Sequence, residues 1–138
     1  MKRYYEQDRS INTLPIHAYF IPFESPDSVY NNRRTSKAYQ DMNGVWALKE
    51  YKSILDVADD FYLSDPDAKI EVPSCLQIHG YDQMQYTNFF YPFSDNPPYT
   101  PNRNPAYHYS RRFVIKQDNQ KRYLCFEGVD SCFYLYIN

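Results

Sequence analysis

No stretch of this sequence is apolar for long enough to cross a membrane, and no hydrophobic segment follows its charged start, Met1-Lys2-Arg3. A membrane-spanning helix needs about 20 predominantly apolar residues, and a secretory signal places an apolar segment directly after its basic residues. We therefore expect a soluble protein of the cytoplasm with no membrane partner.

A charge excess of either sign is also missing. The 15 Lys and Arg residues are balanced by 17 Asp and Glu residues, which leaves a formal net charge of −2. The basic pairs Arg33-Arg34 and Arg111-Arg112 are too short to form a patch for a polyanion. We expect no nucleic acid among the partners.

Cysteine is scarce, and its count of three is odd. An odd count argues against a complete disulfide framework and favours reduced thiols, as in the cytoplasm. We interpret Cys125 and Cys132 as small buried apolar residues. No combination of the three His and three Cys residues has zinc-site spacing, so we expect no metal bound by this chain.

Large aliphatic residues are few as well, because Ile, Leu, Val and Phe together occupy only about a fifth of the chain. The 16 Tyr residues must therefore supply much of the core. Each buried Tyr hydroxyl needs a hydrogen-bond partner, which strand backbones and loops provide better than an apolar helix bundle. This composition favours an all-β protein.

The first part of the chain lacks regular periodicity. Residues 1–36 are rich in Tyr, Pro and polar residues, which indicates an extended N-terminal arm. Alternation of side chains predicts a strand over 45–51 and a shorter one over 69–72. Between them, Ser53 as N-cap and the apolar spacing that follows predict about two helical turns over 53–62.

The second part of the chain begins with a long Pro-rich stretch, 77–104, of a kind that is usually functional in a compact domain. Alternation then predicts strands over 107–116, 121–127 and 132–138. Four or five strands are too few for a sandwich of two sheets, because one apolar face and the sheet edges stay uncovered. We predict that residues 37–138 are an incomplete β-sandwich domain.

Eight short sequence motifs occur in the same order as in a known protein family. They are Asn12-Thr13-Leu14-Pro15 with Ala18-Tyr19-Phe20-Ile21-Pro22, Met42-Asn43-Gly44-Val45-Trp46, Val72-Pro73-Ser74 through Gln77-Ile78-His79-Gly80-Tyr81-Asp82, Gln85-Tyr86-Thr87-Asn88, Tyr91-Pro92-Phe93, Asn96-Pro97-Pro98-Tyr99, Asn104-Pro105 and Phe126-Glu127-Gly128-Val129-Asp130-Ser131. In this order they resemble the start of the β-galactosidases of glycoside hydrolase family 2, the group that contains the familiar bacterial lactase. The resemblance spans nearly the whole chain.

The resemblance implies a fold and a role. The fold is a jelly-roll-like β-sandwich similar to galactose-binding domains, truncated here, with long loops rich in Pro and Tyr. The role is that of the N-terminal part of an enzyme that hydrolyses terminal β-D-galactosides in carbohydrate metabolism by a retaining mechanism on two carboxyl groups. The implied partners are the galactoside and the remainder of the enzyme or other copies of the chain.

In the family, both catalytic glutamates belong to a later TIM-barrel domain, so we expect no catalytic residue here and no activity from this chain alone. Magnesium and sodium serve the full-length family enzymes, but their ligands are not recognisable in this chain. One departure is Cys75-Leu76, which stands where the family usually has Asn-Trp. This change affects packing more than chemistry, since neither position is catalytic in the family.

The resemblance also implies a substrate-binding residue. Asn88 matches the family asparagine that reaches into the active site and hydrogen-bonds the galactosyl hydroxyls, and an amide offers a neutral polyol both a donor and an acceptor. Without the family, Asn88 is more simply a turn residue in a Pro-rich loop. Tyr86 lies close by in the sequence and is a second candidate for the sugar subsite, with a purely structural role at least as plausible in a chain so rich in Tyr.

Other side chains have simpler explanations than chemistry. His79, Asp82 and Asp130 are types that bind metals or transfer protons, but a backbone hydrogen bond accounts for His79 and turn capping for Asp130. The aromatic residues of the predicted strands and arm, and the Tyr-rich last strand, suggest either a sugar-stacking platform or core, and alternation favours core. The aromatic residues in question are Phe20, Trp46, Phe113 and Phe126.

Two other functions stay open. A stand-alone, non-catalytic carbohydrate-binding module is one alternative, and it requires a closed pair of sheets. A fragment that completes the fold of a partner polypeptide without touching sugar is the other.

Overall fold

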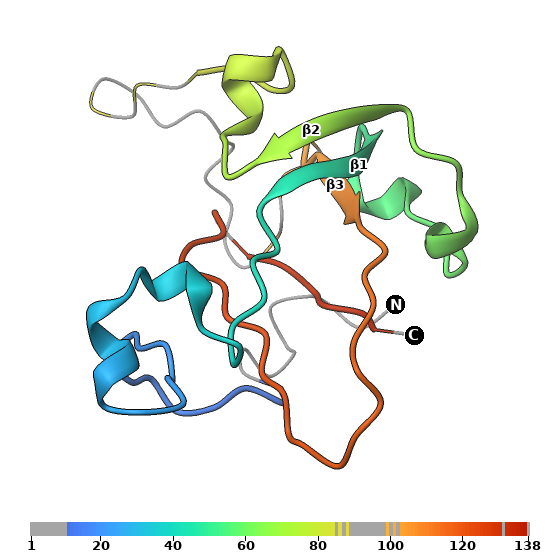
Figure 1. The fold of residues 1–138 in the computed structure, drawn as a ribbon. Coiled ribbons are helices and arrows are strands. Elements are labelled where there is room, and N and C mark those ends of the chain that lie inside the picture. Colours follow the sequence, from blue (N-terminus) through green and yellow to red (C-terminus); the bar gives the residue numbers. More distant parts are fainter. Residues whose placement is uncertain are drawn as a thin grey trace.

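The computed structural model describes residues 11–84, 86, 88, 99, 101, 103–130 and 132–137. Its regular structure is a single antiparallel sheet with short 3-10 helices, and the described residues contain no α-helix (Figure 1). The strands are β1 (Gly44–Tyr51), β2 (Ala68–Val72) and β3 (Ala106–Ser110). The 3-10 helices are η2 (Asp27–Tyr30), η3 (Arg33–Thr35), η4 (Ile54–Asp56), η5 (Phe61–Leu63) and η6 (Leu76–His79). No helix of the described residues is long and apolar enough to span a membrane.

Strand β1 is the centre of the sheet, whose order is β2-β1-β3. Its alternating side chains divide the sheet into two faces, because residues directly opposite in an antiparallel pair point to the same side. Trp46 lies opposite Ile70, and Leu48 lies opposite both Ala68 and Tyr109. This face contains the apolar core, with Leu48 only 1% and Ile70 only 2% exposed. The predicted strands over 45–51 and 69–72 are confirmed.

The opposite face of the sheet is more polar and carries Lys49 paired with His108. The single-turn helix η5 covers part of it, and the ring of Phe61 stands edge-on to His108 with centroids 4.9 Å apart. Tyr136 also contacts Phe61, with ring centroids 5.1 Å apart. The stretch near the C-terminus is therefore joined to the sheet through η5.

The helical segment predicted over 53–62 is correct only in part. Ser53 does cap a helix, since its hydroxyl oxygen accepts a hydrogen bond from the Leu55 backbone N–H at 3.2 Å. The segment nevertheless divides into two separate turns, η4 and η5, because Val57 adopts an extended conformation with φ −78° and ψ 112°. A β-branched residue in a helix this short gains too few hydrogen bonds to offset the cost of nucleation.

The later strand predictions are largely wrong for the described residues. Only 106–110 is a strand, while 111–130 and 132–137 are neither helix nor strand. Alternation makes a segment suitable for a sheet, but a strand forms only where a neighbouring backbone completes the ladder. The described sheet therefore has three strands rather than four or five, in a structure that is mostly β.

One ring contact joins these two late stretches. The rings of Phe126 and Phe133 lie with their centroids 4.9 Å apart. Most of their large apolar side chains remain exposed, including Val114, Ile115 and Leu135. The core interpretation is accordingly right for half-buried Trp46 and wrong for Phe20, Phe113 and Phe126, because no further layer packs against them within the described residues.

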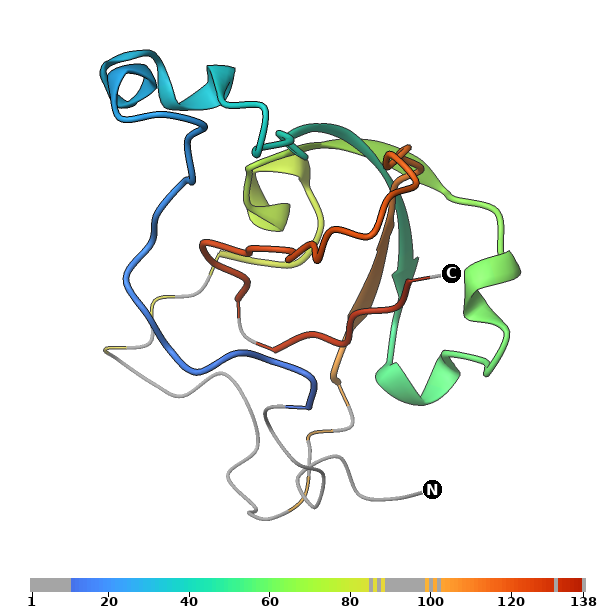
Figure 2. The ribbon, with the colours of Figure 1, turned by 60° about the horizontal axis from the view of Figure 1, so that its bottom comes forward.

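The arm predicted over 1–36 is described from residue 11 onward. Residues 13–23 contain neither helix nor strand, and the segment lies to the side of the sheet in both views (Figures 1 and 2). The buried Ser36 hydroxyl donates to the Pro22 carbonyl at 2.6 Å, and the Lys37 backbone N–H donates to the Glu24 carboxylate at 2.7 Å. These contacts fold the arm back against the start of the sheet domain. The boundary between 1–36 and 37–138 stays a prediction.

Candidate functional site

The two residues predicted to bind substrate lie together. The side-chain nitrogen Nδ2 of Asn88 donates a hydrogen bond to the Tyr86 hydroxyl oxygen at 3.2 Å. Both residues are exposed, Tyr86 to 69%. The Asn88 amide contains a second N–H and a carbonyl oxygen, so it has the capacity to exchange hydrogen bonds with neighbouring hydroxyl groups of a polyol.

Helix η6 and the turn after it precede Asn88 in the sequence. Gly80 ends the helix in the left-handed conformation, with φ 84°, which glycine adopts without the clash of a Cβ atom. Its N–H donates to the Gln77 carbonyl at 3.2 Å, and the Tyr81 N–H donates to the Leu76 carbonyl at 3.1 Å. This hydrogen-bond pattern closes the turn and sends the following residues away from the helix.

Asp82 is also left-handed, with φ 64°. Aspartate tolerates this conformation better than most residues because its short side chain forms local hydrogen bonds. Here the carboxylate oxygen Oδ1 accepts the Gln83 backbone N–H at 2.8 Å and lies 3.5 Å from Nη2 of Arg103. Asp82 therefore has a structural partner near the other end of the Pro-rich stretch, a contact that no local sequence pattern indicates.

The aromatic residues next to this ion pair connect it with the sheet. Tyr81 contacts Tyr107 of β3 edge to face, with centroids 6.4 Å apart. Burial raises the pKa of Tyr107, and the negative charges of Asp82 and Glu50 raise it further. The Tyr107 hydroxyl is buried and has no hydrogen-bond partner among the described residues. It therefore stays a neutral phenol at physiological pH.

His79 forms its side-chain hydrogen bond with Ser74. Its Nε2 lies 3.1 Å from the Ser74 hydroxyl oxygen, and that hydroxyl donates to the Glu71 carbonyl. Because the hydroxyl hydrogen is used on Glu71, Nε2 of His79 is the donor in the contact. The histidine is thus explained by a hydrogen bond, although to a side chain rather than to the backbone as expected.

The thiol and metal hypotheses have separate outcomes. Cys75, Cys125 and Cys132 are free and exposed, so the interpretation of Cys125 and Cys132 as buried is wrong. The pairing of late strands that would bury these two is not formed within the described residues. Among the same residues, no three His, Cys, Asp or Glu side chains gather as a metal site would require.

A second polar cluster was missed by sequence reasoning. Nη1 of Arg111 donates to the carbonyl oxygens of Met42 and Asn43, each at 2.6 Å, and its guanidinium lies 6.0 Å from the centroid of the Trp46 ring. The indole Nε1 of Trp46 donates to the same Met42 carbonyl at 2.9 Å. Gly44 adds a left-handed φ of 116° beside the guanidinium. The arginine therefore holds the turn that opens β1.

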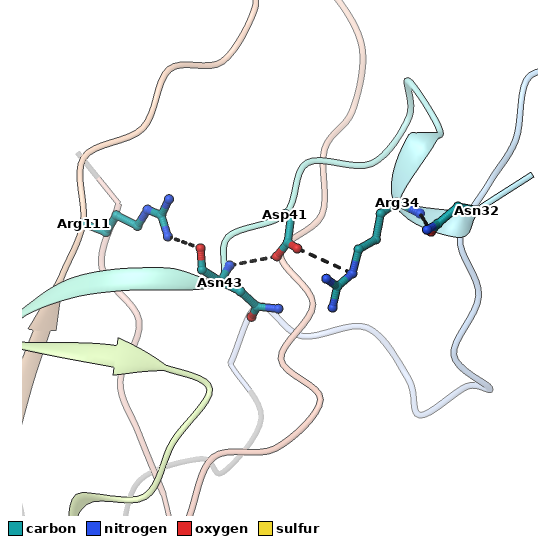
Figure 3. Close-up of polar contacts among 5 residues, drawn as sticks. All are labelled: Asn32, Arg34, Asp41, Asn43 and Arg111. Atoms are coloured by element: carbon teal, nitrogen blue, oxygen red, sulfur yellow. Dashed lines mark hydrogen bonds and ion pairs between the residues drawn. The ribbon is translucent and has the colours of Figure 1, made fainter. Parts of the chain in front are cut away.

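The cluster continues into the arm, as Figure 3 shows. The Asp41 carboxylate accepts the Asn43 backbone N–H at 2.9 Å and pairs with Nε of Arg34 at 3.8 Å. We call the set Arg34, Asp41, Asn43 and Arg111 the arginine clasp. It joins η3, the start of β1 and the chain just after β3, and its only signal in the sequence is an arginine in a strand-like alternation.

Comparison with known proteins decides the family. Residues 39–138 match the family model described as glycosyl hydrolases family 2, sugar binding domain. The chain belongs to this family. The resemblance drawn from the eight motifs is thereby confirmed.

Individual members of glycosyl hydrolase family 2 are also similar. The β-galactosidase of Actinobacillus pleuropneumoniae is 37% identical over 129 residues, which cover 93% of this chain and 13% of that enzyme. The β-galactosidase of Staphylococcus xylosus is 37% identical over 136 residues, with the same shares. The β-galactosidase of Vibrio cholerae is 36% identical over 135 residues, 91% of this chain and 12% of the enzyme. The chain thus spans about an eighth of these relatives.

Proposed function

We propose that this chain is the N-terminal sugar-binding part of a β-galactosidase and that Asn88 and Tyr86 contribute to its galactosyl subsite. The observation that supports the proposal most is the hydrogen bond between these two exposed side chains, in a chain of the family 2 sugar-binding domains. Tyr86 holds one N–H of the Asn88 amide, which orients the other polar positions of that amide toward a neutral polyol.

The proposed reaction is retaining hydrolysis of terminal β-D-galactosides. Such hydrolysis uses two carboxyl groups about 5 Å apart, one as acid and base and the other as nucleophile. In this proposal another part of the polypeptide supplies both, and the present chain moves no proton. It hydrogen-bonds the galactosyl hydroxyls and closes one side of the substrate pocket, with magnesium and sodium bound elsewhere in the enzyme.

We also propose how the fold is completed and which partners complete it. The described sheet is one layer of a jelly-roll-like β-sandwich, and further strands of the enzyme or of another copy cover the exposed apolar residues of 111–137. Support comes from the number of large apolar side chains left exposed there, since a monomeric soluble surface rarely carries so many together. We place the protein in the cytoplasm, where the three free thiols stay reduced.

The test replaces the matching residues of the Actinobacillus pleuropneumoniae enzyme with this chain and measures hydrolysis of a chromogenic β-galactoside. Asn88→Ala is expected to lower kcat/KM by about 1–3 kcal/mol of transition-state binding, the usual cost of a lost polar contact. Assembly and thermal stability should be unchanged. The exposed turn residue Asn119 provides the control, because Asn119→Ala removes a similar amide far from the subsite in sequence.

One outcome of this experiment would contradict the proposal. If Asn88→Ala lowers the melting temperature while kcat/KM per assembled site stays unchanged, the residue only closes a turn. The proposal of a galactosyl subsite in this chain would then be wrong.

A further inference from the structure

Asp82 and Arg103 lie on either side, in the sequence, of the segment that contains Tyr86 and Asn88. Their side chains meet, with Oδ1 of Asp82 3.5 Å from Nη2 of Arg103. The Asp82 side chain is only 22% exposed, whereas that of Arg103 is 64% exposed. The carboxylate is therefore the enclosed member of the pair and the arginine is the member that reaches it from outside.

The backbone at Asp82 sets the direction in which the chain leaves the sheet region. Its left-handed φ of 64° bends the chain two residues after the left-handed turn at Gly80. The carboxylate then holds the next peptide through the Gln83 N–H at 2.8 Å. One side chain thus fixes both the local bend and the contact across to Arg103.

The partner side of the contact is anchored independently. The Asn104 carbonyl, next in sequence to Arg103, accepts the Ile54 backbone N–H at 2.8 Å. Two residues further on, β3 begins and pairs with β1. The edge-to-face contact of Tyr81 with Tyr107 lies beside the ion pair and ties the residue before Asp82 to the same strand. Arg103 is consequently a fixed point to which Asp82 can be held.

We propose that Asp82 is a positioning residue for Asn88, and that it acts through its ion pair with Arg103. The pair holds the Gln83 peptide close to the anchored residues before β3, and so limits the directions that the Asn88 amide takes. The inference rests on the proposed function for its kinetic meaning, but the position of Asn88 can be measured without sugar. An exposed pair has modest strength, so a change of about threefold to fivefold in kcat/KM is expected on its loss.

The experiment compares Asp82→Asn, Arg103→Gln and the double variant. Asparagine keeps the shape of aspartate and its tolerance for the left-handed conformation, so Asp82→Asn removes the charge alone. In the isolated chain, the readout is the pair of side-chain amide signals of Asn88 in nitrogen–proton NMR spectra, assigned by their loss in Asn88→Ala. The readout in the hybrid enzyme, which is the Actinobacillus pleuropneumoniae enzyme with this chain in place of its matching residues, is kcat/KM.

Two further variants make the comparison specific. Arg103→Lys keeps the positive charge and should retain the wild-type signals, since the contact uses a single nitrogen atom. Asp118→Asn removes a different exposed ion pair, with Arg122 at 2.9 Å, and should leave the Asn88 signals in place. A change caused by general loss of surface charge would appear in Asp118→Asn too.

The expected result is that both single variants and the double variant move the Asn88 signals to the same new position, with the strand signals of β1 to β3 unmoved. Equal effects indicate that the two residues act as one unit. Unmoved Asn88 signals in Asp82→Asn, or single effects that add in the double variant, would overturn the inference. If Asn88→Ala leaves kcat/KM unchanged, the proposed function fails, while the NMR comparison still decides the positioning role.

Discussion

At the scale of single residues, the described structure explains side chains mostly by the contacts that hold them. Asn88 is hydrogen-bonded to Tyr86 and His79 to Ser74, and Asp82 forms an ion pair with Arg103. Only the first of these pairs consists of two well-exposed candidates for sugar binding. Partners of this kind decide whether a polar residue is available to a ligand or occupied by the fold, and they lead to two predictions.

The first prediction concerns the Tyr86 hydroxyl. Tyr86→Phe removes the oxygen that accepts the Asn88 amide hydrogen and leaves the ring in place. In the hybrid enzyme, we expect kcat/KM to decrease. The decrease should correspond to a loss of about 0.5–1.5 kcal/mol of transition-state binding, the net value of a neutral hydrogen bond. Tyr30→Phe, at a highly exposed arm position, is the control. Equal kinetics for the two variants would contradict an orienting role for Tyr86.

The second prediction concerns His108. Burial, and secondarily the charge of Lys49, lowers the pKa of His108 in the folded chain. The unfolded chain takes up the proton first as the pH falls below about 6.5. The free energy of unfolding should therefore decrease from that pH down to the lowered pKa, and level off below it.

Urea unfolding at several pH values measures this decrease. His108→Gln should remove it, whereas His17→Gln, at an exposed arm position, should leave it intact. A decrease that persists in His108→Gln would assign the effect to other groups.

At the scale of elements, tertiary contacts decide where each strand begins and ends. Strand β1 begins at Gly44, directly after the two carbonyl groups that Arg111 binds. Strand β3 ends at Ser110. The next residue is the same arginine, Arg111, whose side chain binds the carbonyl groups of Met42 and Asn43. The arginine clasp therefore sets two boundaries at once, which the alternation over 107–116 did not reveal.

The prediction at this scale is that Arg111→Ala destabilises the sheet. It leaves two carbonyl oxygens without their charged donor and exposes the face of Trp46. A loss of about 2–3 kcal/mol in the free energy of unfolding is expected, as for hydrogen bonds to a charged group. Chemical denaturation followed by Trp46 fluorescence measures it. Arg112, the exposed neighbour, supplies the control variant Arg112→Ala. An equal loss of unfolding free energy in Arg112→Ala would argue against the arginine clasp.

At the scale of the whole molecule, the described residues form one sheet with a small core. Leu48 and Ile70 are the buried apolar residues, while many large side chains of 111–137 are exposed. A three-stranded sheet with so small a core is close to the limit of independent stability. In the proposed function, further strands of an enzyme or another copy of the chain cover the apolar surface of the late stretches.

The last prediction follows from this surface. The isolated chain is expected to hydrolyse no chromogenic β-galactoside above a heat-treated control, and to be oligomeric or only marginally stable. Sedimentation at micromolar concentration and thermal unfolding measure the second property. A compact monomer that unfolds cooperatively would contradict it and would favour a stand-alone carbohydrate-binding module.

The sequence by itself determined the family, the strands over 45–51 and 69–72, and the Ser53 cap, because each depends on residues close together in the chain or on motifs in a set order. Tertiary structure alone decided that β3 stops at Ser110, that Cys125 and Cys132 are exposed, and that Asp82 meets Arg103. The physical reason is that alternation and polarity state only what a segment is suited to. Whether it becomes a strand, a buried face or an ion pair depends on a partner distant in sequence, and local patterns do not specify that partner.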